Sequence, residues 1–287
     1  MTEPAGPAAL VLVATPIGNW GDISARALDE LERADSVACE DSRRTGALFA
    51  HFGLAHDPFI VCNDHTEVHA AEEIVRRIQS GQRVVLVSDA GTPAISDPGY
   101  RAVRAAIDAG VSVEVVPGPS AVLAAVSLSG FATDRFCFEG FLPRKGGDRS
   151  RRLQMIAEEG RTTVIFESPR RLEAALVDLA EACGDDRKVA IARELTKTYE
   201  EIWRGTIADG IEWLGERPAK GEIVVVIDGA PERELADADL TALLELELQG
   251  GASTRDAVAS VVGQTGAPKR RVYDLANELH HLSLIHI

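Results

Sequence analysis

The sequence lacks the features that mark several common classes of protein. None of its apolar runs approaches the roughly 20 residues that a membrane-spanning helix needs, and its N-terminus has no basic flank of the kind found in signal peptides. The cysteines include no CxxC pair, which argues against a zinc ribbon or a disulfide framework. We therefore expect a cytoplasmic globular protein with no membrane contact and no metal site. Its four cysteines are then ordinary thiols, at Cys39, Cys62, Cys137 and Cys183.

Familiar nucleotide-binding and hydrolase motifs are missing as well. No GxGxxG follows the first apolar run and no GxxxxGK[ST] is present, so the usual dinucleotide and P-loop sites lose their main support. GxSxG and HExxH are absent, which weakens serine-hydrolase and zinc-protease interpretations. The common Rossmann-type methyltransferase would show a glycine-rich first turn, and that is not found either.

Positive charge is scarce, with 30 Lys and Arg against 45 Asp and Glu and a formal net charge of -15. Such a balance argues against loose, non-specific binding to nucleic acid but not against a local basic site. Residues 143–152 form one such site, because only Asp148 opposes the cations there, and residues 269–271 form a shorter second cluster. A charge run is usually a solvated surface, so neither cluster names a partner by itself. The cations of the first segment are Arg144, Lys145, Arg149, Arg151 and Arg152.

Apolar runs and helix-length amphipathic stretches alternate along the chain, a pattern typical of an α/β fold with a mainly parallel sheet. We expect strands at residues 10–15, 36–39, 59–61, 83–87 and 111–115. Helices are expected at residues 23–34, 67–80 and 99–108, and Asp22 is a candidate cap for the first of them.

Two prolines around a glycine at residues 117–119 interrupt this pattern and predict a crossing between two domains, residues 1–117 and 118–228. The second domain is predicted to hold strands at residues 136–138, 162–166, 188–192, 200–204 and 222–227, with helices at 150–158 and 169–182. Several of these strands follow one another directly, which favours antiparallel pairing.

Residues 229–287 are predicted to form a linker and a small helical unit. Helices are expected at residues 239–249, 253–263 and 269–281, an arrangement similar to a helix-turn-helix. The final segment, 282–287, shows no capping or amphipathic pattern, and no role is assigned to it.

Three turns that follow predicted strands are candidates for ligand binding. The first is Thr15–Asn19 and the second, at residues 87–99, contains two carboxylates, two glycines and two prolines. In α/β proteins, ligands bind at the carboxyl ends of parallel strands. The third is at residues 117–121, where Ser120 is placed to cap a helix and to offer its hydroxyl to a ligand. A tight turn or a rigid linker without a ligand remains an alternative for the first and third.

The runs that carry a family resemblance occur in order from Leu10 to Ile227: ATPIGNWGDISARALDELERADSVACEDSRRTGALF, SDAGTPAISDPG, VPGPSA, FESPRR, ARELTKTYEE and KGEIVVVI. Together they resemble the ribosomal RNA small subunit methyltransferase I family. The helical unit is similar to that family's C-terminal extension. Trp20 and Ser42 depart mildly from the family's pattern, where leucine and threonine are expected.

The resemblance implies a two-domain fold of the tetrapyrrole-methylase type, also called class III, with a small helical C-terminal unit. It further implies a homodimer that binds S-adenosylmethionine between the two domains and methylates the ribose 2′-oxygen of a cytidine in the decoding region of 16S rRNA, within the small ribosomal subunit. Carried onto this sequence, the donor site comprises Pro16, Gly18, Asp89, Gly91, Thr92, Ser120, Ala121, Phe166, Ala192, Arg193 and Gly221.

The group that withdraws the proton from the ribose hydroxyl is left open by the sequence. Asp41, Arg43, Glu167 and Lys197 are candidates, and the lysine qualifies as a base only if burial or cationic neighbours lower its pKa. Ordinary salt bridges are the alternative for all four. Two other functions stay open: methylation of a tetrapyrrole-like small molecule, and a non-catalytic RNA-binding role.

Overall fold

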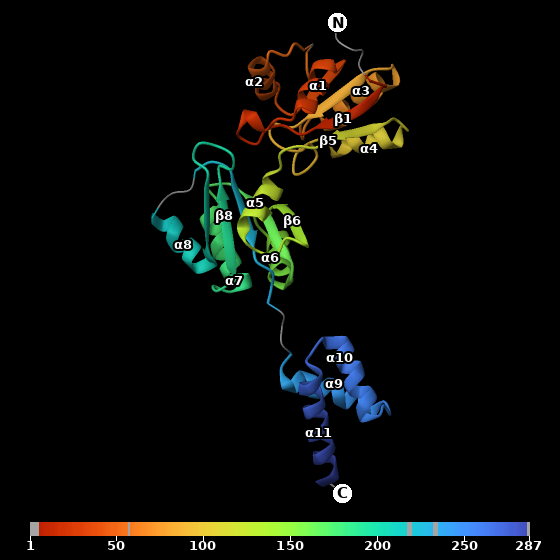
Figure 1. Cartoon of the computed structure of the whole chain (residues 1–287), viewed down its shortest axis with the longest axis vertical. Helices are drawn as coiled ribbons and strands as arrows, with labels where there is room; N and C mark the ends of the chain where they lie inside the picture. Colours follow the sequence, from red (N-terminus) through yellow and green to blue (C-terminus); the bar gives the residue numbers. More distant parts are fainter. Residues whose placement is uncertain (1–5, 57, 217–219, 232–234, 286–287) are drawn as a thin grey trace. The chain divides into compact units, whose positions relative to one another are not determined.

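The computed structural model describes residues 6–56, 58–216, 220–231 and 235–285. The chain divides into two units, residues 1–230 and 231–287, which are considered separately (Figure 1). The first unit contains two five-stranded sheets and their helices, and the second is helical. The α/β prediction is therefore confirmed.

The first sheet is wholly parallel, with the order β3-β2-β4-β1-β5. Successive residues of a strand face opposite sides, so Leu10 packs with α3 and α4 while Val11 packs with α1 and α2. We call this sheet and its four helices the N-terminal lobe. Its strands are β1 (Ala9–Val13), β2 (Ser36–Cys39), β3 (Ile60–Val61), β4 (Arg83–Val87) and β5 (Val113–Val116), and its helices are α1 (Ala25–Arg33), α2 (Ser42–Phe52), α3 (Glu67–Gln79) and α4 (Tyr100–Asp108).

One local prediction for the N-terminal lobe is wrong, and one helix was missed. Asp22 does not cap α1, because it ends a short 3-10 turn, η1 (Trp20–Asp22), and Ser24 accepts the capping hydrogen bond from the amide of Ala27. The helix α2 was not predicted, since its sequence opens with two arginines and shows no clear apolar stripe. Asp41 caps its start, and Gly53 ends it in the left-handed conformation.

The second sheet has the order β6-β7-β10-β8-β9, in which only the β6–β7 pairing is parallel. This confirms the prediction of antiparallel pairing. Helix α8 was not predicted, and α6 begins three residues before the predicted start. This C-terminal lobe has the strands β6 (Phe136–Phe141), β7 (Thr162–Glu167), β8 (Lys188–Arg193), β9 (Glu201–Thr206) and β10 (Ile223–Ile227), and the helices α5 (Ala121–Ser129), α6 (Gly147–Glu158), α7 (Leu172–Cys183) and α8 (Ile207–Glu216).

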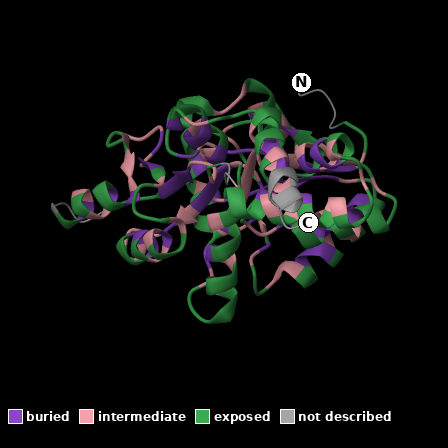
Figure 2. Cartoon of the chain, turned by 90° about the horizontal axis from the view of Figure 1, so that it is seen from below, coloured by how far each residue is buried: buried purple, intermediate pink, exposed green. Residues whose placement is uncertain are grey.

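The second unit contains α9 (Asp237–Gln249), α10 (Thr254–Thr265) and α11 (Lys269–Ile285). They pack on a small core that includes Leu240, Val258 and Val272. Helix α11 continues to Ile285, four residues beyond its predicted end at residue 281, and residues 286–287 lie outside the described part. Figure 2 shows that buried residues lie mostly on the strands and on the inner sides of the helices. No helix in the described ranges is long and apolar enough to span a bilayer.

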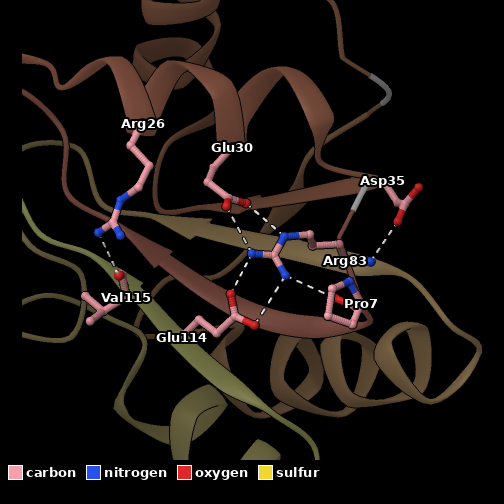
Figure 3. Close-up of polar contacts among 7 residues, drawn as sticks. All are labelled: Pro7, Arg26, Glu30, Asp35, Arg83, Glu114 and Val115. Atoms are coloured by element: carbon pink, nitrogen blue, oxygen red, sulfur yellow. Dashed lines mark hydrogen bonds and ion pairs between the residues drawn. The ribbon is translucent and has the colours of Figure 1, made fainter. Parts of the chain in front are cut away.

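A buried arginine, Arg83, joins several elements at the amino ends of the strands of the first sheet, opposite the predicted ligand turns (Figure 3). The guanidinium of Arg83 donates to both oxygens of Glu30, at 2.8 and 3.0 Å, to Glu114 at 2.6 Å and to the carbonyl of Pro7 at 3.0 Å. Its backbone amide donates to Asp35 at 2.7 Å. These hydrogen bonds to Glu30 and Glu114 raise the pKa of Arg83. One side chain thus joins α1, β4, β5 and the segment before β1.

Replacing Arg83 with methionine should lower the free energy of unfolding by about 3 kcal/mol, because removal of one partner leaves the remaining charges of a buried pair uncompensated. Urea denaturation would measure the change. Arg104→Met is a matched control, since Arg104 forms an exposed ion pair with Asp108. It should cost about 0.5 kcal/mol or less. Equal losses in the two variants would contradict the role assigned to Arg83.

Candidate active site

The three predicted ligand turns meet beside the first sheet. Thr15 and Gly91 exchange backbone hydrogen bonds of 2.8 and 3.0 Å, which join the turn after β1 to the turn after β4. The hydroxyl of Thr92 donates to the carbonyl of Pro119 at 3.5 Å, which adds the third turn. Ser120 caps α5, as predicted, by accepting a hydrogen bond from the amide of Leu123. Because β1 and β4 are parallel neighbours, their carboxyl ends lie together.

A loop of the C-terminal lobe packs directly on the turn after β1. A Cβ atom on Gly18 would lie 2.4 Å from Cγ of Lys197 and 2.8 Å from the hydroxyl oxygen of Thr196. The amide of Asn19 donates to that same hydroxyl at 3.1 Å. Only glycine permits this approach. The contact holds the two lobes together at the site.

A cavity of about 380 Å³, which we call the polar cavity, opens at this contact. From the N-terminal lobe it is lined by the turn after β1, by α2 and by the turn after β4, and from the C-terminal lobe by Lys197 and Glu222. Among the sequence-predicted residues it brings together Pro16, Gly18, Asp89 and Lys197.

A second cavity of about 270 Å³, the apolar cavity, lies against β7, β10 and the start of α5. Its wall includes Ala121, Phe141, Phe166, Leu195 and Val224, and its polar members are Glu167, Ser168 and Glu222. Phe166 meets the rings of Phe138 and Phe141 edge to face, at 4.9 and 5.6 Å between centroids. Ile17 and Glu222 line both cavities, so the two share a wall.

Asp89 is held from the side of β2 and α2. One carboxylate oxygen accepts a hydrogen bond from the amide of Asp41 at 3.0 Å, and the other lies 3.4 Å from the guanidinium of Arg44. Burial raises the pKa of Asp89, and these contacts oppose the shift.

Asp41 and Arg43 form a hydrogen-bonded ion pair at the start of α2. The amide and the guanidinium of Arg43 donate to the carboxylate of Asp41 at 2.6 to 3.0 Å, which lowers its pKa. Both residues line a separate surface depression, which also reaches Asp89. Asp41 is therefore a helix cap and an ion-pair partner in this structure.

Lys197 lies between two carboxylates. Its ammonium donates to Glu194 at 2.8 Å and lies 3.1 Å from Glu222. Burial alone would lower the pKa of Lys197, but these two hydrogen bonds outweigh it and raise the pKa. The condition for a lysine base is thus unmet. Gly221 permits the arrangement, because a Cβ atom there would lie 2.2 Å from the Glu194 carboxylate.

Glu167 ends β7 with its side chain fully buried. One oxygen accepts a hydrogen bond from the amide of Ser168 at 2.7 Å. The other lies 3.3 Å from the guanidinium of Arg171 but has no hydrogen-bond partner within the described residues. A buried carboxylate oxygen in that state fits a ligand that brings a hydroxyl or ammonium donor.

The remaining predicted donor-site residues do not line either cavity. Gly91, Thr92 and Ser120 lie at the junction of the three turns described above. Ala192 is buried in β8, and Arg193 forms an ion pair with Glu201 at 2.7 Å.

Two of the five cations in the basic segment, residues 143–152, form ion pairs with residues of the C-terminal lobe outside that segment. Arg149 pairs with Asp178 at 2.6 Å, and Arg152 pairs with Glu139, so both join α6 to its neighbours. Arg151 is largely exposed and lies 3.3 Å from Asp148. Arg144 and Lys145 are exposed.

Several cavity residues were missed by sequence reasoning. Ile17, Trp20, Arg44, Leu195 and Glu222 line the cavities but were not selected. Glu222 and Leu195 lie within the KGEIVVVI and ARELTKTYEE runs, next to residues that were selected. Arg44 lies on the helix that was not predicted.

Residues 9–210 match the family model of the tetrapyrrole (corrin/porphyrin) methylases, and residues 234–280 match that of the RsmI C-terminal HTH domain. The solved structure of the methyltransferase CobJ resembles the chain with a TM-score of 0.59 at 21% identity, covering 79% of this chain and 96% of that one. A uroporphyrin-III C-methyl transferase from Thermus thermophilus, solved with S-adenyl homocysteine, gives 0.54 at 18%, covering 77% and 96%. The match over residues 9–210 shows that the chain belongs to this class of methylases, and the solved structures show the same fold.

Two relatives narrow the family. The ribosomal RNA small subunit methyltransferase I of Synechocystis is 42% identical over 273 residues, which cover 94% of this chain and 98% of that protein. The protein of the same name from Vibrio cholerae is 46% identical over 247 residues, covering 84% and 85%. The chain belongs to the ribosomal RNA small subunit methyltransferase I family.

Asp97 supplies a pH-dependent test of the loop that carries Asp89. Burial, followed by the charge of Glu40, raises the pKa of Asp97 to about 6. The folded protein thus binds this proton more tightly than the unfolded chain, so stability falls as the pH rises from about 4 to about 6. Asp97→Asn should raise the free energy of unfolding at pH 7 by about 1 kcal/mol, discounted for partial exposure.

Urea denaturation of the native protein and of Asp97→Asn at pH 4 and pH 7 would measure this gain, which should be lost at pH 4. A gain of equal size at both pH values would come from packing and would contradict the proposed ionisation penalty.

Proposed function

We propose that this S-adenosylmethionine-dependent methyltransferase acts on 16S rRNA of the small ribosomal subunit, at the ribose 2′-oxygen of a cytidine in the decoding region. Membership of the family supports an rRNA substrate, because relatives that match most of the chain are named ribosomal RNA small subunit methyltransferase I. The observation that carries the proposal is the shared wall between an apolar cavity and a polar one. Methyl transfer needs a donor and an acceptor held side by side.

The donor is assigned to the apolar cavity and to the turns that border it. Phe166, Phe141 and Leu195 offer the aromatic and aliphatic surface that suits an adenine ring. The buried oxygen of Glu167 fits a hydroxyl or ammonium group of the same molecule. S-adenosylmethionine supplies a methyl group on a sulfonium centre, which is already a good leaving group. Ser120 directly precedes Ala121, which lines this cavity.

The acceptor ribose is assigned to the polar cavity. Glu222 is the carboxylate on the wall common to both cavities, and we infer that it accepts the hydrogen bond, and then the proton, of the attacking hydroxyl. Lys197, held by Glu194, orients Glu222 and remains a cation. Of the four residues that the sequence offered as candidates for withdrawing the proton, Glu167 is then assigned to donor binding, and Lys197 to positioning Glu222. Asp41 and Arg43 shape the start of α2.

We further propose a cytoplasmic homodimer with domains at residues 1–117 and 118–228, followed by the helical extension at 229–287. The exposed cations Arg144, Lys145 and Arg151 are the members of the basic segment best placed to meet phosphates. Arg149 and Arg152 support that segment from within, through their ion pairs.

The tetrapyrrole alternative is weaker. The solved tetrapyrrole methylases resemble this chain at about one fifth identity and establish the fold, whereas the helical extension matches a domain model of the rRNA enzymes. A purely structural RNA-binding protein would have no need of the adjoining cavities.

Calorimetric measurement of S-adenosylmethionine binding should show which of the two cavities holds the donor. Phe166→Ala should weaken binding of S-adenosylmethionine by about tenfold or more, because it removes aromatic surface from the proposed donor cavity. Asp89→Asn and Glu222→Gln should bind the donor as the native protein does, and Glu222→Gln should reduce the rate of methyl transfer by about 100-fold, the lower end expected for loss of a general base. Loss of donor binding in Asp89→Asn would place the donor in the polar cavity instead.

The product should be 2′-O-methylcytidine in 16S rRNA. Small subunits from cells lacking this protein would be incubated with the purified protein and S-adenosylmethionine, and the rRNA nucleosides analysed by mass spectrometry. A methylated ribose releases unmodified cytosine on fragmentation. The Glu222→Gln variant, which should react about 100-fold more slowly, is the matched control. Methylated base, or no product with the native protein, would contradict the proposed reaction.

A further inference from the structure

Trp20 occupies an exposed position at the edge of the polar cavity. It begins the η1 turn directly after the turn of β1, and its side chain is 40% exposed, which is unusual for so large an apolar group. It lines the polar cavity together with Arg44 and Leu48 of α2. Here the chain departs from the leucine that the family resemblance leads us to expect.

The indole ring is held in place from two directions. It stacks on His51, with 4.8 Å between ring centroids and 25° between planes, and meets Phe52 edge to face at 6.2 Å. Asn19 accepts a hydrogen bond from Gly21 at 3.0 Å and donates its own amide to Thr196. The turn that carries Trp20 is therefore fixed to both α2 and the C-terminal lobe. A ring held in this way is a preorganised stacking surface.

We propose that Trp20 is a stacking platform for an unpaired nucleobase of the RNA substrate, next to the nucleotide whose ribose enters the polar cavity. This inference rests on the proposed function. Sequence-specific recognition of RNA usually involves bases that leave their helix and stack on aromatic side chains. Arg44, with a side chain 62% exposed beside the same cavity, is placed to contact the adjoining phosphate.

The position of Trp20 favours an RNA base over the adenine of the donor. Trp20 lines the polar cavity, whereas Phe166 and Phe141 form the aromatic surface of the apolar cavity. The polar cavity carries the cations Arg44 and Lys197 and the anions Asp89 and Glu222. Such a mixed lining suits a ribose, with a base stacked at its edge. A nucleobase presents the same flat surface whatever its identity, so this contact adds affinity more than sequence choice.

Steady-state methylation of unmodified small subunits tests the proposal. Trp20→Leu should raise the KM for the subunit by about tenfold, within the range measured for removal of a base-stacking aromatic side chain. It should leave kcat and the dissociation constant of S-adenosylmethionine nearly unchanged. Trp20→Phe should raise the KM less than Trp20→Leu does, because phenylalanine keeps an aromatic ring for stacking. Tyr100→Leu, which removes a more exposed aromatic residue at the start of α4, away from both cavities, is the matched control and should have native KM.

Tryptophan fluorescence gives a second readout that does not depend on turnover. The two other tryptophans, Trp203 and Trp213, are partly buried and stack on each other against the core of the C-terminal lobe. A short cytidine-containing oligoribonucleotide should quench the native protein and leave Trp20→Leu almost unquenched.

An unchanged KM in Trp20→Leu, or quenching that persists in that variant, would overturn the stacking role. Weakened donor binding in both Trp20→Leu and Trp20→Phe would instead place the donor's adenine on the indole. Failure of the native protein to methylate the subunit, with normal donor binding, would contradict the proposed function itself and is thus a distinguishable result.

Discussion

The candidate site depends on the close contact between Gly18 and the loop that carries Lys197. The two lobes have separate sheets, and they meet at the turn after β1, where Ile17 packs in a core cluster with residues of the C-terminal lobe. At Gly18 the backbone of the N-terminal lobe lies where any side chain would collide with Lys197 and Thr196. This contact sets the width of the polar cavity and the distance between residues contributed by the two lobes.

In the C-terminal lobe, the ion pairs beside this contact depend on an unusual backbone conformation at Glu194. Glu194 adopts a left-handed backbone conformation, with φ of 52°, and its carboxylate occupies the space that Gly221 leaves free. One oxygen of this carboxylate accepts hydrogen bonds from both Lys197 and the amide of Glu222. Such strain in a residue other than glycine persists only where surrounding contacts enforce it, and it is often found at functional sites. The result is a carboxylate at Glu222 whose position is set by its neighbours.

The sequence was sufficient to predict the strands, because most of them are short apolar runs bounded by polar turns. It was also sufficient to select turns that the structure brings together, since the carboxyl ends of parallel strands share one edge. It could not divide the selected residues between two cavities. That division depends on how far Phe166 and Asp89 lie from each other in the folded chain, which no local pattern encodes. Trp20, Arg44 and Glu222 were missed because each becomes notable only beside residues far away in the sequence.

The acidity of the protein is compatible with a role on RNA if binding is local. A net charge of -15 opposes general attraction to a polyanion, so affinity must come from a few well-placed contacts. Within the described residues, much of the positive charge near the site is already paired, as with Arg43 on Asp41 and Lys197 on Glu194. Electrostatic attraction alone would then be weak and strongly dependent on salt. A stacked aromatic ring adds binding energy that salt screens far less, which gives an exposed tryptophan at the cavity edge a physical role that further contacts to phosphate could not fill.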